Sequence, residues 1–86
     1  MNINDLITIV KKKIKDNISI QNIDVKDKTF LHKNHEGHNP KKFHIKLIIK
    51  SSELKKMDKI QASKKIYSTL KKELDDYIHS IQILIN

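Results

Sequence analysis

The chain has 86 residues, a formal net charge of +8 and no cysteine, and all 18 of its basic residues are lysine. This length suits one small domain, which we expect to span residues 1–86. The lack of cysteine excludes disulfides and a self-contained Cys-ligated site, and a single glycine excludes a phosphate-binding loop or a dinucleotide fingerprint. Neither a cysteine nucleophile nor an oriented serine–histidine–aspartate set is in view, so we do not expect an enzyme.

The first forty residues predict a helix, a strand and a loop. Apolar residues recur at helical spacing after a candidate N-cap, Asn2 or Asn4; they are Ile3, Ile7, Val10 and Ile14. Residues 18–25 then alternate, with a phase slip at residues 21–22, which predicts a strand with a bulge or kink. Residues 27–40 are polar and hold the only glycine and the only proline, so they predict a loop.

The second half predicts a strand, two helices and a final strand. Residues 43–50 alternate as a half-buried strand does, and residues 51–57 can form one short helical turn. Asp58 then opens a longer helix, with Gln61 three residues on as its capping-box partner. The inner stripe of this helix is Ile66, Leu70 and Leu74. Residues 77–85 form the last strand, in which one face carries Ile81, Ile83 and Ile85.

This order (α-β-β-α-α-β) predicts an α+β sandwich of two layers. The second strand, the long helix and the last strand form a β–α–β unit, whose strands run parallel when they share a sheet. We therefore expect a three-stranded mixed sheet with the helices on one face. Neither a signal peptide nor a membrane-spanning stretch is recognisable, so we expect a monomer in the cytoplasm, or in an organelle matrix in a eukaryote.

Four of the five histidines lie within residues 32–44, and the fifth is far along the chain. His44 opens the second strand and His79 the last, so parallel pairing brings both to one end of the sheet, roughly 5 Å apart laterally. Strict alternation puts the two out of phase, so fraying or twist at the strand starts is needed for the imidazoles to converge. The two histidines, with 34 residues between them in the sequence, are thus candidates for one site. Accessory candidates, for zinc, copper or nickel, are His32, His35 and His38.

Two segments, "HIKLIIKSSEL" and "KKIYSTLKKELDDYIHSIQI", closely resemble the BolA family. The spacing from His44 to His79 fits without a gap, and "NISIQNIDVKDKTFLHKNHEGH" fits the first strand and loop of the family. The resemblance therefore covers nearly the whole chain. It implies a fold like a class II KH domain, in agreement with the order of elements above.

For function, the resemblance implies partnership with a monothiol glutaredoxin. BolA-like proteins form heterodimers with these glutaredoxins and share a [2Fe–2S] cluster with them, in iron–sulfur trafficking or iron regulation. The glutaredoxin and glutathione bring thiolates. The BolA-like chain brings the histidine that is His79 here and, in one subgroup, the histidine that is His44 here. Two imidazoles fill only part of the four ligand positions, so we expect the isolated chain to bind no cluster.

The resemblance also implies an alternative, because some bacterial members are described as transcriptional regulators that bind DNA. Segment 52–76 would then act as a helix-turn-helix-like surface. Its candidate phosphate or partner contacts are Lys55, Lys56, Lys59, Lys64 and Lys65. The family's "RHR"-type segment is Ala62-Ser63-Lys64 here, so the forked guanidinium contacts are missing. We therefore favour the adaptor over the DNA-binding regulator.

Overall fold

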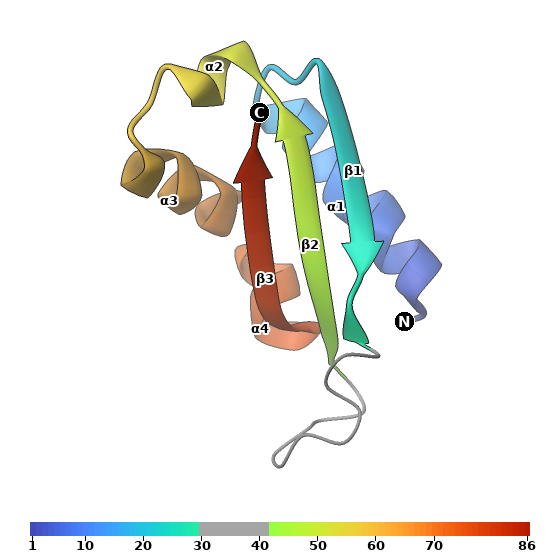
Figure 1. Ribbon diagram of the computed structural model, residues 1–86. Helices are drawn as coiled ribbons and strands as arrows, with labels where there is room; N and C mark the ends of the chain where they lie inside the picture. Colours follow the sequence, from blue (N-terminus) through green and yellow to red (C-terminus); the bar gives the residue numbers. More distant parts are fainter. Residues whose placement is uncertain (30–41) are drawn as a thin grey trace.

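The computed structural model describes residues 1–29 and 42–86, and it places three strands in one sheet with α1, α3 and α4 behind one face (Figure 1). The elements are α1 (Ile3–Asn17), β1 (Asn22–Asp27), β2 (Phe43–Lys50), α2 (Ser52–Lys55), α3 (Lys59–Thr69), α4 (Lys71–Asp76) and β3 (Ile78–Ile85). β2 lies in the centre, antiparallel to β1 and parallel to β3. The expected α+β fold with a three-stranded mixed sheet is confirmed.

α1 begins where the sequence predicts. The side chain of Asn2 accepts a hydrogen bond from the backbone N–H of Asp5 (2.8 Å), which caps the first turn. The residues that α1 buries completely recur every four positions and are Leu6, Val10 and Ile14. Ile3 and Ile7 lie beside this stripe and are only partly buried. The predicted stripe is therefore correct in its C-terminal half, but it omits Leu6.

The predicted first strand begins too early. Ile18 is the C-cap of α1 and lies before β1. The main chain of Ser19 bonds to the β2–α2 corner: its carbonyl accepts from Ser51 Oγ (2.7 Å) and its N–H donates to Glu53 (3.3 Å). These two side chains take the place of a neighbouring strand, so the segment connects α1 to β1 instead of extending β1.

The long helix predicted from Asp58 is divided in two. Asp58 does cap it, because its side chain accepts from a backbone N–H of the first turn (2.8 Å). The helical backbone is interrupted at Leu70 (φ −103°, ψ 17°), between α3 and α4. Just before this point, Ser68 Oγ and Thr69 Oγ1 both donate to the carbonyl of Lys65 (3.0 and 2.8 Å). Hydroxyl groups that bond back to the preceding turn bend helices, which accounts for the interruption.

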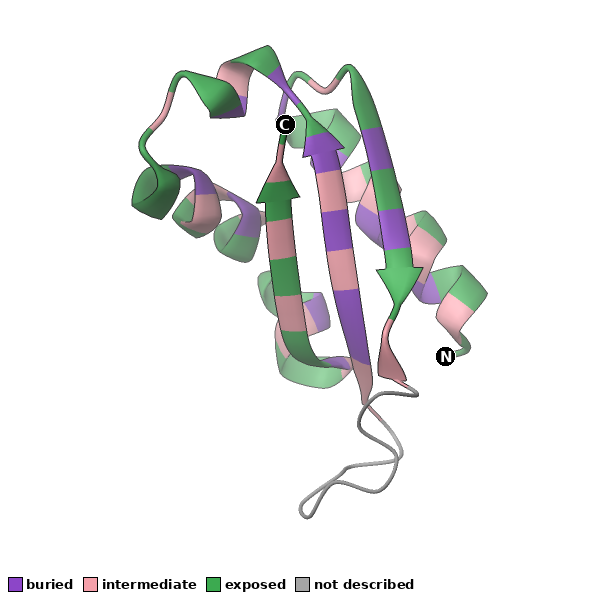
Figure 2. Cartoon of the chain, in the orientation of Figure 1, coloured by how far each residue is buried: buried purple, intermediate pink, exposed green. Residues whose placement is uncertain are grey.

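The core lies between the sheet and the helices. Alternate strand residues face it, so β1 and β2 change between buried and less buried along their length (Figure 2). The fully buried side chains of β2 are Ile45, Leu47 and Ile49. In the predicted helix stripe, Ile66 and Leu70 are fully buried and Leu74 is partly buried. The predicted packing face of the helix is therefore confirmed.

An ion pair joins α4 to α1. The side chain of Glu73 is only 4% exposed, and both of its oxygens accept hydrogen bonds from Nζ of Lys13 (2.9 and 2.7 Å). A buried carboxylate requires such a partner. The contact therefore holds α4, and with it the start of β3, against α1.

Because β2 and β3 are parallel, their first residues lie at the same end of the sheet, as the topology predicts. Most of the predicted loop (residues 27–40) lies outside the described residues, because the structure does not describe residues 30–41. In the described ranges, none of the helices combines the length and apolar character that crossing a membrane requires.

Candidate metal-ligating site

A β-bulge at the start of β3 brings the two described histidines together. Phe43 pairs with Ile78, but the next residue, His44, pairs with Ser80, so His79 is an extra residue in β3. Where two residues of one strand oppose one residue of its neighbour, the alternation of side chains is locally broken. Strict alternation would direct the two histidines to opposite faces, and the bulge removes this obstacle.

The two imidazoles meet edge to face. Nδ1 of His79 lies 3.3 Å from Nε2 of His44, the ring centroids are 4.8 Å apart, and the ring planes are inclined by 86°. His44 is 4% exposed, whereas His79 is exposed to solvent. The structure therefore brings the two histidines into contact and leaves one of them accessible to another molecule.

Ser80 is the second neighbour of the His44 ring. Its Oγ lies 2.6 Å from Nδ1 of His44, so each nitrogen of this imidazole faces a side chain of β3. The main chain of His44 is also held, because its N–H donates to Thr29 Oγ1 (3.2 Å) and its carbonyl accepts from the N–H of Lys28 (2.7 Å). Ser80 is not among the residues that the sequence predicts for the site. Its place directly after His79 was the available signal.

The spacing of the imidazole nitrogens suits a metal ion. Two nitrogen ligands at about 2.1 Å from one tetrahedral ion lie about 3.4 Å apart. The nitrogens of His79 and His44 are 3.3 Å apart. A neutral imidazole ligates through the nitrogen without hydrogen, while a second group holds the N–H on the other side. In the tautomer with hydrogen on Nδ1, His44 donates to Ser80, and its Nε2 accepts a hydrogen bond from Nδ1 of His79. A metal ion held by both nitrogens would replace this hydrogen bond.

Two imidazoles alone are too few to complete the coordination of a metal ion. Within residues 1–29 and 42–86, no group of three or more histidine, cysteine, aspartate or glutamate side chains is arranged to hold a metal ion. The residues predicted as accessory ligands lie outside the described ranges; they are His32, His35 and His38. The described residues therefore do not complete a metal site, and a metal ion bound by this pair needs further ligands from outside them.

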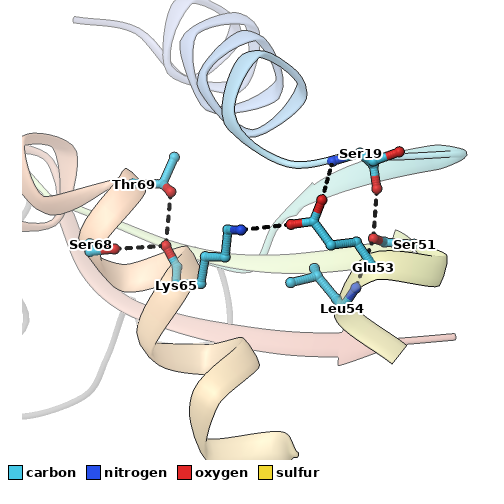
Figure 3. A network of polar contacts seen from close by, with 7 residues as sticks. All are labelled: Ser19, Ser51, Glu53, Leu54, Lys65, Ser68 and Thr69. Atoms are coloured by element: carbon cyan, nitrogen blue, oxygen red, sulfur yellow. Dashed lines mark hydrogen bonds and ion pairs between the residues drawn. The ribbon is translucent and has the colours of Figure 1, made fainter. Parts of the chain in front are cut away.

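The lysines predicted for a nucleic-acid or partner surface lie on α2, α3 and their connection. The exposed members are Lys55, Lys56, Lys59 and Lys64. Lys65 is half-buried, and its Nζ donates to Glu53 (2.7 Å) in a network that includes Ser19 and Ser51 (Figure 3). Two hydrogen bonds lower the pKa of Glu53: the one from Lys65 has the larger effect, and the one from the N–H of Ser19 has the smaller effect. Within the described ranges, the ammonium group of Lys65 is therefore bonded inside the fold, whereas those of the other four lysines have no hydrogen-bond or ion-pair partner.

The fold and the imidazole pair define a small α+β domain with two histidines in contact at one end of two parallel strands. The family model described as "BolA-like protein" matches residues 14–86, so the chain belongs to the BolA-like family. The resemblance carried by the sequence segments is thus confirmed. No curated protein matches the chain.

Several solved structures share the fold. The BolA domain of SufE1 from Arabidopsis thaliana has a TM-score of 0.81 at 20% identity, over 99% of this chain and 94% of that chain. BolA1 from Arabidopsis thaliana has a TM-score of 0.76 at 19% identity, over 93% and 88% respectively. BolA1 protein from Mus musculus has a TM-score of 0.73 at 16% identity, over 92% and 62%. At these identities the likeness concerns the fold alone.

Proposed function

We propose that this BolA-like protein is an adaptor that completes a [2Fe–2S] cluster carried by a monothiol glutaredoxin, with His79 and His44 as its ligands. The observation that carries the proposal is the 3.3 Å separation between Nδ1 of His79 and Nε2 of His44. Membership of the BolA-like family supports it, as does the exposure of His79 to a partner.

The number of ligands explains why the cluster is shared. A [2Fe–2S] cluster has four ligand positions, and a chain without cysteine offers imidazoles but no thiolate. A glutaredoxin cysteine and glutathione supply the missing thiolates. Clusters with two imidazoles on one iron and thiolates on the other are chemically sound. The cluster therefore stays between the two proteins, for iron–sulfur trafficking or iron regulation, and the isolated chain holds none.

Each side chain at the site has a separate part. His79 is exposed and meets the partner, whereas His44 is buried and its ring is oriented before the partner arrives. The hydroxyl of Ser80 lies 2.6 Å from Nδ1 of His44. In the proposed arrangement it accepts the hydrogen of Nδ1 and leaves Nε2 for iron, as carboxylates and carbonyls do for other metal-bound histidines. Because these contacts exist in the free chain, little ordering is required on binding.

The experiment is a titration of the chain into cluster-loaded monothiol glutaredoxin with glutathione, followed by visible circular dichroism. We expect a spectrum distinct from that of the glutaredoxin alone. His79→Ala should abolish this spectrum, and His44→Ala should weaken or alter it. The control is the triple alanine variant of His32, His35 and His38, which should change it little. Loss of the spectrum in the triple variant, with retention in His79→Ala, would contradict the proposal.

A second pair of variants tests the part of Ser80. Ser80→Ala should lower the affinity for cluster-loaded glutaredoxin about tenfold, as expected when a metal ligand loses its supporting hydrogen bond. Ser80→Thr keeps a hydroxyl and should restore most of the affinity. Nitrogen-15 NMR of the His44 ring measures its tautomer without any cluster. If Ser80→Ala changes neither the tautomer nor the affinity, Ser80 does not position His44.

The alternative is a DNA-binding regulator that uses segment 52–76. Its support is a set of exposed lysines on this segment, namely Lys55, Lys56, Lys59 and Lys64. Lys65 argues against it, because its ammonium group is already bonded to Glu53 (2.7 Å). The adaptor depends on the histidines and the regulator on the lysines. Binding of duplex DNA that survives His79→Ala, and is lost when the four lysines are replaced, would favour the regulator.

A further inference from the structure

A cavity of about 350 Å³ lies between β3 and the α2–α3 connection. Its apolar walls include Leu54, Met57, Ile83 and Ile85, and Lys55 and Lys59 also line it. Its volume falls within the usual range of ligand-binding pockets. β3 runs from the histidines to this cavity, with α2 and α3 beyond its free side (Figure 1). The cavity and the histidine pair therefore occupy opposite ends of one strand.

The end of β3 has unpaired backbone groups. β3 pairs with β2 on one side only, where the N–H of Asn86 donates to the carbonyl of Ile49 (2.8 Å). In a parallel ladder, alternate residues bond to the same neighbour. The N–H and C=O groups of Ile83 and Ile85 therefore point toward the free edge. Among the described residues they have no hydrogen-bond partner there.

The two edges of the sheet differ in their protection against pairing with another chain. β1 carries the charged residues Asp24, Lys26 and Asp27, and charges are a common protection of edge strands. β3 reads IHSIQILI and contains neither charge nor proline over eight residues. Leu84, near its end, is 45% exposed. Such an unprotected edge is a place where a further strand can add.

The charges around the cavity select the partner. Lys55 and Lys59 have no ion pair within the described ranges, and Asp58 between them is occupied as the N-cap of α3. A second copy of the chain would bring the same lysines and a net charge of +8 to this edge, so like charges oppose self-pairing. An acidic segment would satisfy both lysines.

We propose that the free edge of β3 binds an extended acidic segment of another protein as a fourth strand. The main-chain groups of Ile83 and Ile85 pair with this segment, and an apolar side chain of the segment enters the cavity. Lys55 and Lys59 contact its carboxylates. Backbone bonds supply affinity in this mode of recognition, and the pocket and charges supply specificity. The site uses none of the residues of the histidine pair and does not depend on the proposed cluster function.

The test uses the full chain and a fluorescein-labelled peptide in which glutamate alternates with valine. We expect saturable binding by fluorescence anisotropy, weaker at higher salt. NMR should record slower amide exchange at Ile83 and Ile85 in the bound state. A peptide with a central proline, which lacks one backbone donor, should bind more weakly.

Two charge-reversal variants separate the cavity from general electrostatics. Lys55→Glu with Lys59→Glu should weaken peptide binding about tenfold, because two screened charge contacts are reversed. Lys15→Glu with Lys72→Glu makes the same change in net charge at exposed positions of α1 and α4. This control pair should have little effect.

Several results would overturn the proposal. If both double lysine variants weaken peptide binding equally, the peptide is attracted only by the general positive charge of the protein. Amide protection along β1 instead of β3 would place the peptide elsewhere. Tighter binding of single-stranded oligothymidine, in competition with the peptide, would make the cavity a nucleic-acid site. His79→Ala should bind the peptide unchanged, so failure of this proposal and failure of the cluster proposal are told apart.

Discussion

The two ends of β3 differ in how their polar groups are satisfied. At its start, the side chains of Ser80 and His79 contact the imidazole of His44 at 2.6 and 3.3 Å, respectively. At its end, the outward backbone groups of Ile83 and Ile85 have no partner within the described residues. The first end is ordered by contacts inside the chain, which suits a small rigid group with fixed bond directions. At the second end, the backbone groups that face away from β2 are left for another molecule, which suits an extended chain that becomes ordered on binding.

The local form of the ladder accounts for this difference. At the start of β3 the bulge directs His79 and Ser80 toward one residue of β2. Toward the end, the ladder is regular, so each second residue turns its backbone groups away from β2. The same strand therefore presents side chains as ligands at one end and main-chain groups as ligands at the other.

The largest expected effect is that a variant at one end of β3 loses the function proposed for that end and keeps the function proposed for the other. His79→Ala should abolish the shared-cluster spectrum and leave the anisotropy of the acidic peptide unchanged. Lys55→Glu with Lys59→Glu should weaken peptide binding and keep the cluster spectrum. Both measurements are made on the same preparations. If either variant loses both activities while its far-ultraviolet circular dichroism stays native, the two ends are not independent.

A core substitution should affect both ends together. Leu70 is fully buried where α3 meets α4. Leu70→Ala should lower the free energy of unfolding on the order of 2–5 kcal/mol, because it leaves a cavity. Urea unfolding followed by circular dichroism measures the change. The control is Ile60→Ala, at a residue of α3 that is 69% exposed, with an expected change within about 0.5 kcal/mol. A cost near zero for Leu70→Ala would mean that the helix is misplaced.

The support behind the histidine end should depend on Lys13. Lys13→Met leaves the carboxylate of Glu73, 4% exposed, without its partner, and should cost on the order of 2 kcal/mol. Lys12→Met removes only a surface pair with Asp16 and should cost less than about 0.5 kcal/mol. Thermal unfolding compares the two variants. Equal costs would mean that the buried position of Glu73 does not matter.

The smallest expected effect is the loss, at acidic pH, of the stability that Glu53 contributes near the cavity. The hydrogen bond from Lys65 lowers the pKa of Glu53 below its ordinary value of 4.5. The contribution of Glu53 to stability is therefore fully present above pH 4.5 and is lost as the pH falls through the lowered pKa. The difference in melting temperature between the protein and Glu53→Gln should be constant near neutral pH and shrink below pH 4.5. For Lys65→Met, the difference in melting temperature from the unchanged protein should also shrink below pH 4.5. A difference that grows in acid would contradict this assignment.

Much of the fold could be predicted because periodic burial and end signals are local. The helix caps at Asn2 and Asp58 are confirmed, and so are the alternation of β2 and the parallel pairing of β2 with β3. The meeting of His44 and His79 at one end of the sheet follows from that pairing. These features depend on residues close in sequence, or on the handedness of one crossover.

Only the tertiary structure decided the details that make the site. Which residue of β3 is extra depends on its register with β2, so the bulge at His79 leaves no sign in either strand alone. The place of Ser80 next to His79 makes it a candidate, but only the register brings its hydroxyl to His44. The later start of β1 than predicted has the same origin, because Ser19 bonds to side chains more than thirty residues away. The sequence by itself determined which faces are apolar. The packing of distant segments decided where backbone and imidazole groups find their partners, because a hydrogen bond requires both groups to be in place.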